Sequence, residues 1–158
     1  MLGVSLGGVI TVELSSKINP EKVFVISSVK SSKEFPFYII LLNWLKVKYI
    51  ISSKLLKSGK LFIELFFGKM NKSDKHLINK MIDDTDEVFT PWVAKAIIEW
   101  QSKDNLTPFN KIVQIVGDKD LIFRHANMKD CVVVKGGTHV MILDKAFEIS
   151  GIIDNFEP

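Results

Sequence analysis

Two patterns of apolar positions alternate along this chain, one typical of helices and one typical of buried strands. Residues 6–17 repeat apolar side chains at helical spacing, and Asn19-Pro20 predicts the end of that helix. Residues 23–26 are apolar on both faces, like a strand inside a parallel sheet, residues 112–116 predict a second buried strand and residues 131–134 a third strand. Residues 145–156 then predict a closing helix.

The pattern between the first two of these strands is helical. Residues 33–108 contain no convincing strand, and their large apolar side chains predict a packed helical insertion rather than a linker. The predicted segments are helices over residues 37–45 and 47–56, an apolar segment over residues 61–67, a helix capped by Ser73 and a helix that begins at Thr90-Pro91. Strands alternating with helices predict one α/β domain over residues 1–158, a parallel sheet with flanking helices.

Composition argues against nucleic-acid binding, disulfides and a thiolate metal site. Hydrophobic residues make up 47% of the 158 residues and charged residues 25%, an ordinary globular balance. The formal charge is only +3, and Arg124 is the only arginine, so the sequence gives little support for nucleic-acid binding. Cys131 is the only cysteine, which excludes an intrachain disulfide and a thiolate metal site. We therefore expect a reducing compartment, the cytoplasm.

Targeting and membrane signals are weak. The apolar start has neither the basic region nor the small-residue cleavage site of a signal peptide. The longest apolar run, residues 35–45, is shorter than the ~20 residues that span a bilayer. Lysines interspersed over residues 35–60 have two interpretations. We favour helices packed over a site with their lysines outward, and the alternative is a basic amphipathic surface that contacts a membrane.

The first eight residues carry the strongest chemical motif. Gly3, Ser5 and Gly7 spell G-x-S-x-G directly before a helix, the pattern of a nucleophile elbow. In such a turn the serine adopts strained backbone angles that expose its hydroxyl, and small neighbours make room for it. The competing interpretation is a nucleotide-binding glycine loop. It fits poorly, because Ser5 stands where a dinucleotide motif needs glycine and no P-loop lysine follows.

Two later loops follow predicted strands and carry an acid and a histidine. Gly117-Asp118-Lys119-Asp120 holds two candidate acids, and Gly136-Gly137-Thr138-His139 holds the candidate base. Serine becomes a strong nucleophile when a histidine oriented by a carboxylate takes its proton. The ends of parallel strands meet at one edge of a sheet, so we expect these side chains to meet there. The competing interpretations are a turn residue for Asp118 and a loop or capping residue for His139.

With its elbow, acid loop and histidine loop in this order, the whole chain resembles the α/β-hydrolase superfamily. The resemblance implies Ser5 as nucleophile, Asp120 rather than Asp118 as orienting acid, His139 as general base and the Leu6 N–H as an oxyanion donor. It implies no cofactor and no metal, and it makes residues 33–108 a helical lid. The expected reaction is hydrolysis of a small-molecule carboxylic ester or similar acyl substrate.

The resemblance also implies a part that the sequence lacks. A complete α/β-hydrolase has about five strands up to the elbow, and here only Met1 and Leu2 precede the motif. The loop that supplies a second oxyanion N–H is missing too. We therefore expect weak or no activity from this chain alone. We also expect an open edge at residues 23–26, with which a missing N-terminal piece or another chain could pair. The alternative function is a truncated, catalytically inactive fragment or interaction domain.

The remaining candidate residues have structural interpretations. Trp92 and Trp100 are expected in the core rather than on a substrate platform. His76 and His125 are expected on the surface, and Cys131 as a buried small side chain within its strand. Other enzymes of this fold remain open: an acyltransferase, a hydrolase of C–C bonds, or a haloalkane-type hydrolase. The last usually has an aspartate nucleophile where this chain has Ser5.

Overall fold

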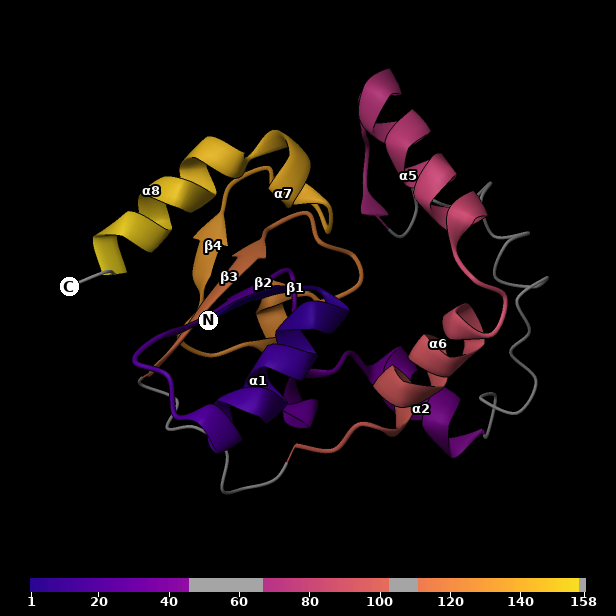
Figure 1. Cartoon of the computed structure of the whole chain (residues 1–158), viewed down its shortest axis with the longest axis horizontal. Helices are drawn as coiled ribbons and strands as arrows, with labels where there is room; N and C mark the ends of the chain where they lie inside the picture. The colour runs from indigo at the N-terminus through magenta and orange to yellow at the C-terminus, as the bar shows by residue number, and fades with distance from the viewer. Residues whose placement is uncertain (46–66, 103–110, 157–158) are drawn as a thin grey trace.

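A computed structural model describes residues 1–45, 67–102 and 111–156 of the chain (Figure 1). Within these ranges four parallel strands form one sheet, in the same order as in the sequence: β1 (Leu2–Val4), β2 (Val23–Ile26), β3 (Ile112–Gly117) and β4 (Val132–Val134). Gly3 pairs with Val25, and Ile115 pairs with Val132. The predicted α/β fold class is confirmed, and the carboxyl ends of the strands meet at one edge.

Helices cover both faces of the sheet (Figure 1). On one face, α7 (Met141–Asp144) and α8 (Ala146–Phe156) enclose a cluster of Phe24, Ile26, Val113, Ile115, Val134, Met141 and Ile149. On the other, α1 (Leu6–Ile18) encloses a cluster of Val12, Val23, Val25 and Ile112. Successive residues of a strand point to opposite faces, so the mainly apolar runs of β2 and β3 fill both layers, and Gln114 is a buried polar exception in β3.

In its described parts, residues 33–45 and 67–102, the predicted insertion consists of helices joined by short non-helical segments. It contains the short helix η1 (Ser32–Glu34), α2 (Phe37–Trp44), α5 (Lys72–Asp84) and α6 (Phe89–Glu99). Helices α2 and α6 pack against each other, and α5 stands away from the sheet (Figure 1). The predicted helix over residues 47–56 and most of the segment over residues 61–67 lie outside the described residues.

Two helix starts differ from the prediction. Asn71, not Ser73, caps α5, because its Oδ1 accepts a hydrogen bond from the Asp74 N–H at 2.8 Å. Helix α6 begins at Phe89, ahead of Thr90-Pro91, where Asp86 Oδ1 accepts hydrogen bonds from two backbone N–H groups. In both cases an upstream polar side chain satisfies first-turn donors before the predicted cap is reached.

Two predicted burials were wrong. Trp92, expected in the core, is 56% exposed on α6. Cys131 precedes β4 and is only partly buried, because the strand begins one residue later. Trp100 does pack against the core, and its Nε1–H donates to Glu13 Oε1 at 2.8 Å.

The predicted open edge was also misplaced. Residues 23–26 pair with β1 on one side and with β3 on the other, so β2 is an interior strand. The outer strand on this side of the described sheet is β1, and its Leu2 is 51% exposed. Of the two other histidines, His76 is exposed, as expected, and His125, the first residue of η5 (His125–Asn127), is partly buried.

Candidate active site

Ser5 occupies a strained turn between β1 and α1. Its φ of 51° and ψ of −121° are angles that a residue with a side chain rarely adopts. Conformations of this kind cost about 1–3 kcal/mol and persist only where surrounding contacts impose them. Here the Ser5 N–H donates to the Ile26 carbonyl at 2.9 Å, and the Ser5 carbonyl accepts from the Gly8 N–H at 2.9 Å. The turn is thereby held between the second strand and the first helix.

Two of the neighbouring glycines are needed for space. A Cβ at Gly3 would collide with the Gly7 carbonyl oxygen and Thr11 Oγ1. A Cβ at Gly8 would lie only 2.5 Å from Ser28 Cβ. At Gly7 a Cβ would meet nothing within 4 Å, so the close approach of Gly3 to Gly7 requires a glycine at position 3 and not at position 7. Gly3 and Gly8 therefore let α1 pack closely against β1 and against the residues that follow β2.

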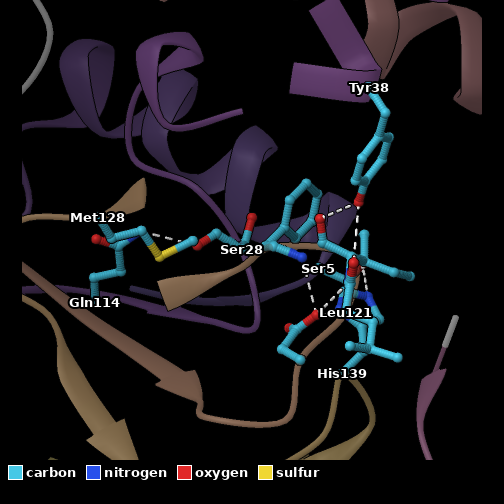
Figure 2. Close-up of polar contacts among 10 residues, drawn as sticks. Ser5, Ser28, Tyr38, Gln114, Leu121, Met128 and His139 are labelled. Atoms are coloured by element: carbon cyan, nitrogen blue, oxygen red, sulfur yellow. Dashed lines mark hydrogen bonds and ion pairs between the residues drawn. The ribbon is translucent and has the colours of Figure 1, made fainter. Parts of the chain in front are cut away.

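The structure brings Ser5, Asp120 and His139 together. Ser5 Oγ lies 2.9 Å from His139 Nε2 (Figure 2), and His139 Nδ1 lies 3.0 Å from Asp120 Oδ2. His139 is 4% exposed and Asp120 is 3% exposed. If Nδ1 carries its proton toward the carboxylate, Nε2 is free to accept the serine proton. This is the order of contacts that activates a serine nucleophile.

The two candidate acids have different partners. Asp120 Oδ1 accepts hydrogen bonds from the backbone N–H groups of Ile122 and Phe123 at 2.8 and 2.9 Å, which leaves Oδ2 for His139. Asp118 Oδ1 instead accepts from the Gly136 N–H at 2.7 Å and so joins the acid loop to the histidine loop. The side chain at position 120, and not that at 118, contacts the imidazole.

Comparison with known proteins identifies the architecture. No protein-family model matches the sequence, and no curated protein matches it. Among solved structures, a hydrolase from Pseudomonas aeruginosa PA01 superposes with a TM-score of 0.66 at 13% identity, over 98% of this chain and 63% of that chain. A thermophilic esterase gives 0.65 at 16% identity, over 98% and 64%. The enol-lactonase from Burkholderia xenovorans LB400 gives 0.63 at 14% identity, again over 98% and 64%.

This chain has the α/β-hydrolase fold. It spans slightly less than two thirds of the length of the solved structures named above. Leu6, directly after Ser5, is the first residue of α1. The first N–H groups of a helix have no partner within the helix and point along its positive end. The Leu6 N–H is thus a candidate donor to negative charge that develops beside Ser5.

Two aromatic rings lie beside the imidazole of His139. The rings of Phe67 and Phe123 each lie 5.6 Å from the His139 ring, centroid to centroid. Gly68, with a φ of 90°, approaches Thr138 so closely that a Cβ there would lie 2.5 Å from Thr138 Cγ2. The insertion therefore contacts the histidine loop directly. Sequence reasoning missed these contacts, because no periodicity or motif relates residues 67 and 139.

The described part of the chain contains no gathering of three His, Cys, Asp or Glu side chains that could hold a metal ion. Among the helices in that part, none is both long enough and apolar enough to cross a membrane.

Proposed function

We propose that this protein is a serine hydrolase that transfers the acyl group of a carboxylic ester, or of a similar acyl substrate, to water. The observation that carries the proposal is the hydrogen-bonded chain from Ser5 through His139 to Asp120, which begins at the strained turn of Ser5. The resemblance to hydrolases and an esterase of the same fold supports it. We also propose that residues 33–108 act as a lid and that the protein works in the cytoplasm.

The proposed reaction follows from the geometry of these groups. Ser5 Oγ attacks the substrate carbonyl carbon as His139 Nε2 takes its proton, and Asp120 stabilises the imidazolium that forms. The Leu6 N–H donates to the oxygen that becomes negative. His139 then protonates the leaving alcohol. Water, deprotonated by His139, attacks the acyl-enzyme, and Ser5 recovers its proton when the acid leaves.

The apolar surroundings of His139 support an apolar substrate. Phe123 is 2% exposed, and its ring and that of Phe67 contact the imidazole. The buried Phe123 ring excludes water from the base, and the half-buried Phe67 ring offers contacts to an apolar acyl or alkyl group. We therefore propose small esters with an apolar part as the substrate class.

Fluorophosphonate labelling of the purified protein, read by peptide mass spectrometry, tests the proposal. We expect one label, on Ser5, that is lost in Ser5→Ala. Ser16→Ala is the matched control, because Ser16 lies on the same helix and its hydroxyl donates to the Glu13 carbonyl, away from the site. A protein that melts cooperatively and takes no label would overturn the proposal and favour a catalytically inactive domain.

A further inference from the structure

Tyr38 joins the insertion to the loop that carries Asp120. It lies in the first turn of α2, and its hydroxyl is placed between two backbone carbonyls of the acid loop (Figure 2). The Oη atom lies 3.1 Å from the Leu121 oxygen and 2.6 Å from the Ile122 oxygen, and donates toward both. Burial raises the pKa of Tyr38 above its usual value of 10.0, and the nearby Asp120 charge raises it further. The hydroxyl therefore stays protonated, and remains a donor, at neutral pH.

The two carbonyls belong to the peptide groups that hold Asp120. One peptide group contains the Leu121 carbonyl and the Ile122 N–H, and the next contains the Ile122 carbonyl and the Phe123 N–H. Both N–H groups donate to Asp120 Oδ1, at 2.8 and 2.9 Å. Tyr38 and Asp120 thus bind opposite ends of the same two peptide groups. A donor on a carbonyl polarises its amide and strengthens the N–H on the other side.

We propose that Tyr38 is a positioning residue for the reaction proposed above, on which this inference rests. Its hydroxyl orients two peptide groups, these orient Asp120, and Asp120 holds the His139 ring toward Ser5. Tyr38 contacts none of the reacting atoms. The insertion therefore acts on the site through a hydrogen bond to the acid loop.

A stacking contact supports the same loop from the side. The Phe35 ring lies 6.1 Å from the Phe123 ring at 29°, and Phe35 lies two residues before the start of α2, next to its N-cap Pro36. This contact fixes where α2 meets the acid loop, but an aromatic ring cannot orient a peptide group as a hydrogen bond does. Removing only the hydroxyl of Tyr38 keeps the packing and removes the directional contact.

The test compares Tyr38→Phe with wild type and with Ser16→Ala, which also loses one hydroxyl-to-carbonyl hydrogen bond, on α1. Fluorophosphonate labelling is measured over a range of probe concentrations. We expect the maximal labelling rate to fall about tenfold in Tyr38→Phe, because small misplacements of catalytic groups cost up to about a hundredfold. The half-saturating probe concentration should stay unchanged. Ser16→Ala should match wild type in both.

Backbone hydrogen exchange provides a readout that does not require activity. In Tyr38→Phe we expect faster exchange of the Ile122 and Phe123 N–H groups, with the strand amides unchanged. An unchanged maximal rate, or a change confined to the half-saturating concentration, would overturn the proposal. If wild type takes no label, the proposed function fails, and exchange decides alone: selective acceleration at these two amides supports the positioning of Asp120, and unchanged exchange contradicts it.

A second variant covers the case in which Tyr38→Phe no longer melts cooperatively. 4-Aminophenylalanine at position 38 keeps the ring and an N–H donor in place of the hydroxyl. Wild-type exchange at Ile122 and Phe123 in this variant supports the donor role, and accelerated exchange at both amides overturns it.

Discussion

The sheet and the insertion contain similar apolar side chains but bury them differently. In the sheet, Val25 and Ile115 are completely buried between helices. In the insertion, Trp44 is 76% exposed and Met81 is 56% exposed. The difference shows that the packed core belongs to the strands and the helices beside them, because a parallel sheet buries both of its faces.

The two regions also contribute differently to the candidate site. Ser5, Asp120 and His139 all lie in loops at the ends of strands, where buried backbone holds them. The insertion reaches them through Tyr38 and Phe67. A region with much exposed apolar surface thus touches the candidate site at a few points, while the sheet determines where Ser5, Asp120 and His139 lie.

The largest expected effect is on the labelling rate, and it should distinguish Asp120 from Asp118. Asp120→Asn should lower the labelling rate about 10⁴-fold, because an amide favours the wrong imidazole tautomer. Asp118→Asn is the matched control, since its remaining oxygen can still accept from the Gly136 N–H. Labelling rates measured on proteins with equal melting temperatures check this. Similar losses in both variants would show that the hydrogen-bonded chain is not the source of reactivity.

A pair of truncations tests the contrast in burial. Ile115→Ala should lower the free energy of unfolding by about 2–5 kcal/mol, since the residue is 0% exposed and leaves a cavity. Met81→Ala in α5 should change it by no more than about 0.5 kcal/mol. Urea denaturation measures both. Equal losses would mean that the insertion is as tightly packed as the sheet.

A smaller effect tests the close approach at the elbow. Gly3→Ala should destabilise the protein by about 1–3 kcal/mol, because the new Cβ collides with the Gly7 carbonyl and forces the backbone apart. Gly7→Ala should lose no stability, since its Cβ would meet nothing within 4 Å. Thermal melts compare the two. A larger loss in Gly7→Ala would contradict this packing.

The smallest expected effect concerns a buried carboxyl where the insertion meets the sheet. Burial raises the pKa of Glu34 above its usual 4.5, although its Oε2 accepts from the Lys30 N–H and from Gln114 Nε2, each at 2.9 Å. Gln114 also donates to the Ser28 carbonyl (Figure 2). The folded state then holds a proton to higher pH than the unfolded state does. The stability this contributes is full below pH 4.5 and is lost as pH rises through the raised pKa.

Glu34→Gln should remove that loss, because the amide stays neutral and keeps an acceptor for both donors. The melting temperature of the variant relative to wild type should therefore rise with pH across this window. Exposed Glu21→Gln serves as the control and should show no such trend. A difference between Glu34→Gln and wild type that does not vary with pH would contradict the assignment.

Local pattern predicted most of the architecture. Residues 23–26 were identified as a buried strand with the bounds observed for β2, and the helices after Ser5 and near the C-terminus begin and end within a residue of those predicted. These elements were readable because periodicity and stop signals act over a few neighbouring residues. The order of serine, acid and histidine after strand ends likewise identified the three side chains that meet.

Contacts between distant segments were decided only by the tertiary structure. No pattern in the sequence relates Tyr38 to the carbonyl of Ile122, or Phe67 to the ring of His139, because such contacts depend on how the insertion lies on the sheet. The edge was misplaced for the same reason: strand order is a property of the assembled sheet. The sequence determined which residues are candidates for the chemistry, and packing decided which neighbours hold them.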